Sequence, residues 1–248
     1  MRKLLHTLAA AGLVATPFVS ARADLILVSP DLVTIGGTGL GSVNTVLTFQ
    51  SSGSNTTEAG CVSFNGSGDA TGSGLTGSQC TGSSGDVKTG ASQTQTRTLS
   101  QVGISSGSGF ALFFNAAEPG GDGITLNSLA VTFYNSAGVA VHTATFAGSH
   151  DFTQTATGTG NTGYLFALNG TQASALDALI SSLGAGNIHV GVSATAGTGL
   201  GATGGNETFF IFNQANTPVF ATPEPSTTAL LATGLFGLVG VVRRRRRS

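Results

Sequence analysis

The sequence predicts an all-β protein whose body is a single β-sandwich of about nine strands with one short helix. Short segments alternate apolar and polar residues, the pattern of half-buried strands. Glycine, serine and threonine separate these segments, and the 38 glycines suit short strands joined by turns. Only one segment carries apolar residues at helical spacing. Many short strands with a single helix favour two packed sheets.

The predicted strands are rich in β-branched and aromatic residues and are spread along residues 24–222, which we assign to one domain. Within 128–134, Leu129, Val131 and Phe133 share one face. The loop 135–138 ends in a glycine suited to positive φ and predicts a hairpin. The nine predicted strands are 25–28, 43–50, 96–104, 110–115, 128–134, 139–146, 163–168, 188–194 and 207–212.

The predicted helix lies between Thr171, a candidate N-cap, and Gly184, a helix stop. Its apolar residues recur at helical spacing, so one face is suited to packing against the sheets. These residues are Leu176, Leu179, Ile180 and Leu183.

The two cysteines, Cys61 and Cys80, lie in a stretch from 51 to 90 that is rich in glycine, serine and threonine. An even number of cysteines in an exported chain favours a disulfide. Because little in this stretch is apolar, we interpret it as a decorated or flexible insertion into the sandwich. The disulfide would staple that insertion.

The N-terminus has the pattern of a cleaved signal peptide over residues 1–23. Arg2 and Lys3 precede a mostly apolar segment, and Ala21 and Ala23 supply the small residues that signal peptidase requires. We therefore expect cleavage after Ala23 and export of the body.

The C-terminal residues 223–248 combine three features in a fixed order. Pro223, Glu224 and Pro225 are followed by an uncharged stretch, 226–242, of 17 residues, near the short limit for crossing a bilayer. The two prolines keep the segment around Glu224 extended and accessible to a protease. Translocation is stopped by a cluster of cations that is costly to move through lipid. The cluster consists of Arg243, Arg244, Arg245, Arg246 and Arg247.

Taken together, these features resemble the PEP-CTERM sorting signal of Gram-negative bacteria. The resemblance implies that an exosortase, a membrane transpeptidase, cuts near Pro223-Glu224-Pro225 after the tail has held the protein transiently in the inner membrane. It further implies delivery of the body to the cell surface or the exopolysaccharide matrix. It covers about a tenth of the chain, and it does not identify the family of the body.

The charge of the body limits its partners. Residues 24–222 carry ten acidic residues against two basic ones, Lys88 and Arg97, so the body has a net charge of about −8. Such a surface lacks the cations needed to bind nucleic acid or anionic lipid. Divalent cations, neutral polysaccharide and other proteins are compatible with it.

A calcium site is the one cofactor interpretation that the body supports. Asn115, Glu118 and Asp122 cluster after the predicted strand 110–115, and Glu207 could join them from a neighbouring loop. Calcium binds carboxylate, amide and main-chain oxygens, often in such irregular loops. Solvated turn acids are the alternative, because the spacing is neither that of an EF-hand nor that of an RTX repeat.

The sequence shows no convincing catalytic constellation, and we assign no catalytic residue. A GxSxG pattern at 103–107 lacks the strand-to-helix context of a nucleophile elbow. The favoured function is therefore a structural or adhesive role at the surface or in the matrix. The alternative is a calcium-dependent carbohydrate-binding module. A secreted hydrolase, with acids such as Glu118, Asp122 and Glu207 arranged across a cleft, ranks third.

Overall fold

The computed structural model describes residues 24–34, 44–51, 56–83, 85–118, 122–153, 162–201 and 205–216. The predicted signal peptide, with Ala21 and Ala23, and the predicted sorting tail 223–248 lie outside these residues. In the described part of the chain, no helix has the length and apolar character needed to span a membrane.

The described residues are mostly β and hold 15 strands, more than the nine predicted. Thirteen of them form one large sheet, whereas the predicted β-sandwich has two packed sheets. Its main path is β3 (Asn44–Phe49), β15 (Glu207–Asn213), β9 (Phe110–Asn115), β13 (Thr162–Leu168), β1 (Leu25–Leu27), β11 (Ala140–Phe146), β10 (Ile124–Tyr134), β14 (His189–Gly197), β4 (Thr57–Phe64) and β5 (Asp69–Gly72). Three short strands extend it: β2 (Val33–Thr34) beside β13, β12 (His150–Phe152) beside β10 and β8 (Arg97–Thr98) beside β14. A separate hairpin consists of β6 (Gly74–Thr76) and β7 (Gln79–Thr81).

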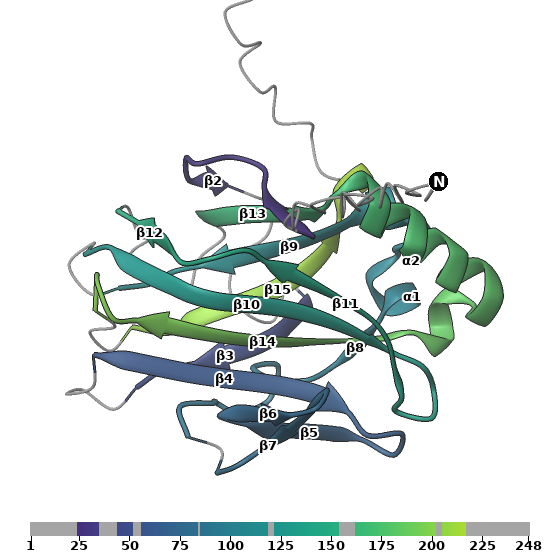
Figure 1. Ribbon diagram of the computed structural model, residues 1–248, viewed down its shortest axis with the longest axis horizontal. Coiled ribbons are helices and arrows are strands. Elements are labelled where there is room, and N and C mark those ends of the chain that lie inside the picture. Colours follow the sequence, from purple (N-terminus) through teal and green to yellow (C-terminus); the bar gives the residue numbers. More distant parts are fainter. Residues whose placement is uncertain are drawn as a thin grey trace, which may run out of the picture.

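This sheet curls so that β3, at one end of the path, lies near β4, close to the other end. In Figure 1, β9, β15 and β3 accordingly lie behind β10, β14 and β4. Strand β1 joins the two halves, because it pairs fully with β13 but with β11 only through Leu25 and Phe146. The approach of β3 to β4 is close: a Cβ on Gly60 would lie 3.0 Å from the Phe49 ring.

The core fills the space inside the curl and is dominated by aromatic rings. Phe114 of β9 stacks on Phe209 of β15 with ring centroids 4.6 Å apart, and Phe110 meets Phe133 of β10 edge to face. A smaller buried cluster that includes Phe113 and Phe210 lies on the other side of β9 and β15. Both faces of these two strands are therefore buried, which explains the continuous apolar run of β9.

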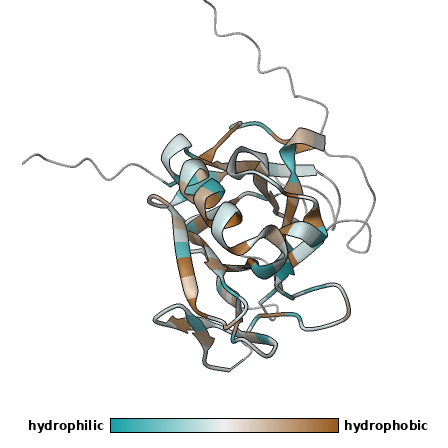
Figure 2. Cartoon of the chain, turned by 90° about the vertical axis from the view of Figure 1, so that its right-hand side faces the viewer, coloured by the Kyte–Doolittle hydropathy of each residue, from teal (hydrophilic) through white to brown (hydrophobic). Residues whose placement is uncertain are grey.

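Helix α2 (Gly170–Leu183) confirms the predicted helix, although its N-cap is Asn169 rather than Thr171. It ends at Gly184, which has φ of 79°. The helices α1 (Leu99–Val102) and α2 lie at one end of the curled sheet (Figure 1). Seen from that end, they lie across the opening of the curl (Figure 2). Short 3₁₀ helices occupy Gly107–Gly109, Ala185–Asn187 and Gln214–Asn216.

The predicted strand 96–104 is wrong. The chain there forms the two-residue strand β8 and then α1, because a capping box starts a helix at Thr98. The Thr98 hydroxyl accepts from the Gln101 N–H at 3.3 Å, and the Gln101 side chain accepts from the Thr98 N–H at 2.8 Å.

The stretch 51–90 differs from the predicted insertion, because its described residues supply β4 to β7 and β4 belongs to the main sheet. Strand β4 pairs with β14 on one side and β5 on the other. The predicted disulfide is confirmed: Cys61 of β4 bonds Cys80 of β7, with Cα atoms 5.9 Å apart. The bond fastens the β6–β7 hairpin to the sheet.

We expect the Cys61→Ala/Cys80→Ala double variant to lose about 3 kcal/mol of unfolding free energy, because the bond closes a loop with a sequence separation of 19. Urea denaturation measures this change. Wild-type protein in reductant is the control and should lose a similar amount. A loss below about 1 kcal/mol would show that the hairpin holds its place without the bond.

Candidate metal centre

Three glutamates from distant parts of the sequence meet at one end of the curled sheet. Glu58 lies at the start of β4, Glu118 follows β9 and Glu207 begins β15. One carboxylate oxygen from each lies within 4.8 Å of the others. The three side chains, which we call the glutamate cluster, are 3%, 1% and 0% exposed, respectively.

Strand alternation directs two of these side chains into the curl. On β15, Glu207 lies on the same face as Phe209, which belongs to the main core. On β4, Glu58 likewise shares a face with Gly60, which packs against Phe49. Phe49 is also the register partner of Glu207. The cluster therefore lies inside the curl, next to the aromatic core.

A glycine brings Glu118 close to Glu207. A Cβ on Gly205 would lie 1.9 Å from the Ala117 carbonyl oxygen and 3.0 Å from the Glu118 Cα. Only glycine permits the two backbones to approach this closely. The loop before β15 thus packs directly on the segment after β9.

The electrostatics of the cluster disfavour charge on its members. Burial, together with the facing carboxyl of Glu58, raises the pKa of Glu207 to about 11. Burial also raises the pKa of Glu58, although hydrogen bonds from Glu207 and Ser51 oppose that shift. Among the described residues, no lysine or arginine pairs with Glu58 or Glu207. Glu58 and Glu207 therefore need protons or a cation to balance their charge.

The hydrogen bonding of the cluster is incomplete. The Ser51 N–H donates to Glu58 Oε2 at 2.7 Å. When Glu207 is ionised, no other described residue donates a hydrogen bond to either of its oxygens or to Glu58 Oε1. The buried Ser51 hydroxyl also lacks a partner among the described residues. A protonated Glu207 can share its proton with Glu58, and a cation could instead bind both.

The structure brings together two of the four residues predicted for calcium, Glu118 and Glu207. Asn115 pairs with Thr208, one position from Glu207, so its side chain points to the opposite face of the sheet. Its amide donates to the Thr162 carbonyl at 2.6 Å. Asp122 is exposed and lies outside the cluster.

Glu58 was missed by the sequence analysis. The signal was the inward alternation of Glu58, Gly60 and Val62 along β4, which the glycine- and serine-rich surroundings concealed.

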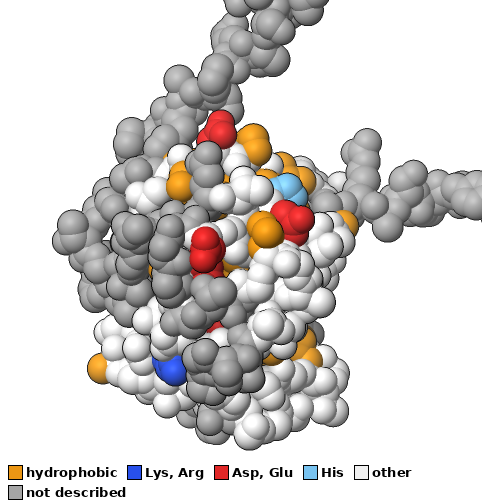
Figure 3. Space-filling model, turned by 90° about the vertical axis from the view of Figure 1, so that its left-hand side faces the viewer, with side chains coloured by type: hydrophobic (Ala, Val, Ile, Leu, Met, Phe, Trp, Pro, Cys, Tyr) orange, Lys and Arg blue, Asp and Glu red, His pale blue; other side chains and the backbone are white. Residues whose placement is uncertain are grey.

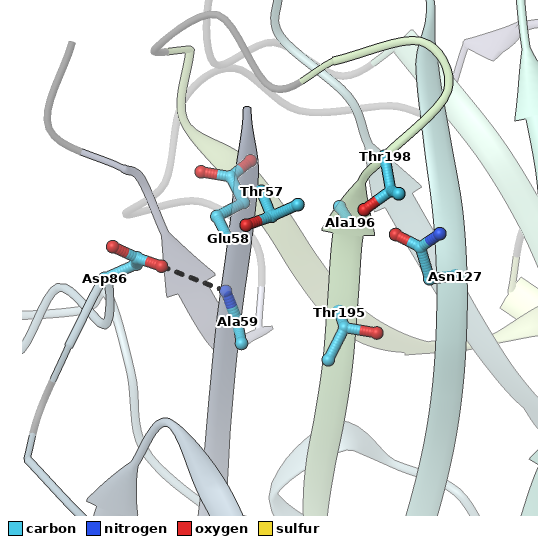
Figure 4. Close-up of a pocket in the computed structure, with 8 residues that line it drawn as sticks. All are labelled: Thr57, Glu58, Ala59, Asp86, Asn127, Thr195, Ala196 and Thr198. Carbon is cyan, nitrogen blue, oxygen red and sulfur yellow. Dashed lines mark hydrogen bonds between the residues drawn. The ribbon is translucent and has the colours of Figure 1, made fainter. Parts of the chain in front are cut away.

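An open pocket of about 450 Å³ lies beside the cluster, over β4, β14 and the neighbouring part of β10. Figure 4 shows Asp86 on one side of β4 and the hydroxyls of Thr57 and Thr195 on the other. The Asp86 carboxylate accepts from the Ala59 N–H at 3.0 Å. The pocket lining is polar apart from its alanines, and it consists of Thr57, Glu58, Ala59, Asp86, Asn127, Thr195, Ala196 and Thr198. Figure 3 views the molecule from this end of the sheet, where acidic side chains show at several points.

The body is thus a disulfide-bonded, acidic β protein with a buried carboxylate cluster. The family model of the PEP-CTERM protein-sorting motif matches residues 221–247. The motif indicates an exported protein that is held in the membrane and then processed by an exosortase. No curated protein and no solved structure matches the chain.

Proposed function

We propose that the body is released from its tail by an exosortase and then serves as a structural or adhesive protein at the cell surface or in the exopolysaccharide matrix of a Gram-negative bacterium. The observation that carries the proposal is the sorting motif at residues 221–247, which follows a folded β body. An extensive hydrogen-bonded sheet and a disulfide suit persistence outside the cell.

A non-enzymatic role is supported by the burial of the carboxyl groups that most resemble an acid and base pair. Glycoside hydrolases place two carboxyls on either side of the scissile bond, where substrate must reach both. Glu118 and Glu207 are 1% and 0% exposed. The glutamate cluster therefore supports ion binding better than hydrolysis.

Processing is tested by mass spectrometry of the mature protein from its native host. We expect a product that begins at Asp24 and lacks the arginines 243–247. Replacing Pro223, Glu224 and Pro225 together with alanine should leave the tail attached in the membrane fraction. Pro218→Ala, outside the matched motif, is the control and should be processed normally. Intact protein in the cytosol, or exported protein that retains its arginines, would contradict the proposal.

The second candidate function is binding of neutral polysaccharide in the pocket beside β4. Its lining offers the hydroxyl, amide and carboxylate groups that bind sugar hydroxyls, namely Asp86, Asn127 and three threonines. None of the described residues that line it carries an aromatic ring of the kind that stacks on sugars, which favours the structural role. A pull-down with exopolysaccharide tests this candidate: Asn127→Ala should abolish retention, whereas Ser136→Ala in the exposed 135–138 turn should not.

A further inference from the structure

We propose that Glu58, Glu118 and Glu207 bind one calcium ion, which ties the start of β4 to the start of β15 and to the segment after β9. This site differs from the one that the sequence predicts, because Glu58 replaces Asn115 and Asp122. It does not depend on the proposed surface role, since an ion can stabilise the body whatever the body binds.

The arrangement fits calcium in the type and separation of its ligand atoms. Calcium–oxygen distances are roughly 2.3–2.6 Å, so oxygens on one ion lie up to about 5 Å apart. The three carboxylate oxygens lie within 4.8 Å of one another. Three carboxylates can supply three to six oxygens. Ser51, whose backbone N–H donates to Glu58, also has a buried hydroxyl without a partner among the described residues. Among the described residues, the ligand atoms of the cluster are all carboxylate oxygens, which favour calcium over a transition metal.

Glu207 gives independent support for an ion. Its side chain is 0% exposed and is directed into the cluster, and when Glu207 is ionised no other described residue donates a hydrogen bond to either of its oxygens. Buried polar atoms are nearly always satisfied, so these oxygens call for a partner. A bound cation would satisfy Glu207 and Glu58 at once and cancel the repulsion between them.

The position of the cluster gives the ion a structural role. In the described sheet, β3 and β4 approach each other without being hydrogen-bonded neighbours. Between them, Val87 forms an isolated β-bridge with Phe49 of β3, and the Asp86 carboxylate accepts a hydrogen bond from the Ala59 N–H of β4. A calcium ion held by Glu58 and Glu207 would join β4 directly to β15, the neighbour of β3. The curled sheet would then be closed by metal bonds where strand pairing does not close it.

The test is the melting temperature of the mature exported protein in calcium, in magnesium and in chelator. Extracellular calcium modules bind with Kd of roughly 10⁻⁴ to 10⁻³ M. A calcium concentration about 100 times Kd should raise Tm by roughly 5–10 °C over the chelated protein. Magnesium should give a much smaller shift, because it requires shorter bonds and nearly ideal octahedral geometry. Calorimetric titration should give one calcium per chain.

Isosteric variants assign the shift to the cluster. Glu58→Gln, Glu118→Gln and Glu207→Gln should each remove most of the calcium-dependent rise in Tm. Asp122→Asn is the matched control, because Asp122 is acidic, exposed and outside the cluster, and it should keep the full rise. An unchanged Tm of wild-type protein in calcium, or a rise that survives in all three glutamine variants, would overturn the proposal. The titration of wild-type protein gives an answer even if a variant fails to fold.

Discussion

In chelator, the free energy of unfolding is expected to fall by about 4 kcal/mol as the pH rises from 5 to 8. The pKa of Glu207 is raised from 4.5 to about 11 in the folded protein. Above pH 4.5 the unfolded chain therefore loses this proton while the folded chain keeps it. A group whose pKa is raised by folding contributes its full stabilisation of the folded state below its unfolded pKa. That contribution is lost as the pH rises toward the folded pKa, which is about 11 for Glu207. The slope is about 1.4 kcal/mol per pH unit for each retained proton.

Urea denaturation at several pH values measures this slope. The carboxyls that raise the pKa of Glu207 are Glu58 and Glu118, and Asp86 acts on Glu58. General repulsion among the acidic side chains also weakens the fold as the pH rises, so a control is needed. Glutamine is neutral at every pH, so Glu207→Gln should reduce the pH slope of the unfolding free energy by the amount due to one retained proton. Asp122→Asn should leave the slope unchanged. A wild-type slope equal to that of Glu207→Gln would refute the buried, protonated Glu207.

Local patterns were sufficient to predict much of the fold. Strand β9 occupies the predicted residues 110–115, and β13, β11 and β15 differ from prediction by about one residue at an end. Each of these segments has β-branched or aromatic residues bounded by turn formers. The strand predicted at 96–104 failed because the capping box at Thr98 acts over three residues and outweighs the alternation that follows.

The candidate site could be predicted only in part, because its residues are brought together by the pairing of strands that are far apart in the sequence. The acids after β9 and before β15 are visible in the sequence, and the pairing of these two strands brings Glu118 and Glu207 together. The contribution of Glu58 requires the sheet to curl until β4 faces β3. No local pattern specifies that curl. Composition also assigned Glu58 to an insertion, whereas its strand lies within the main sheet.

Strand β4 therefore carries a disulfide and a buried glutamate close together. Cys61 bonds it covalently to β7, and Glu58, three residues earlier, faces the carboxyls of Glu118 and Glu207. The two inward positions next to them, Gly60 and Val62, offer little side-chain bulk for packing.

The Phe209→Ala variant is expected to lose about 3–5 kcal/mol of unfolding free energy at pH 5, the range for removing a buried phenylalanine ring. Phe209 is 0% exposed and stacks on Phe114 with ring centroids 4.6 Å apart. It shares the inner face of β15 with Glu207. The resulting cavity would open on the face of β15 that carries Glu207, so water can enter and hydrate its carboxyl.

This hydration distinguishes Phe209 from its neighbour Phe210, which is equally buried but packs on the opposite face of β15. Phe210→Ala should cost a similar amount at pH 5 and keep the wild-type dependence on pH in chelator. Phe209→Ala should show a shallower dependence, because hydrated Glu207 ionises more readily and its pKa falls toward 4.5. Urea denaturation of both variants at pH 5 and pH 8 measures the difference. Equal pH slopes would mean that the ring of Phe209 does not keep water from the glutamate cluster, and that the raised pKa of Glu207 has another source.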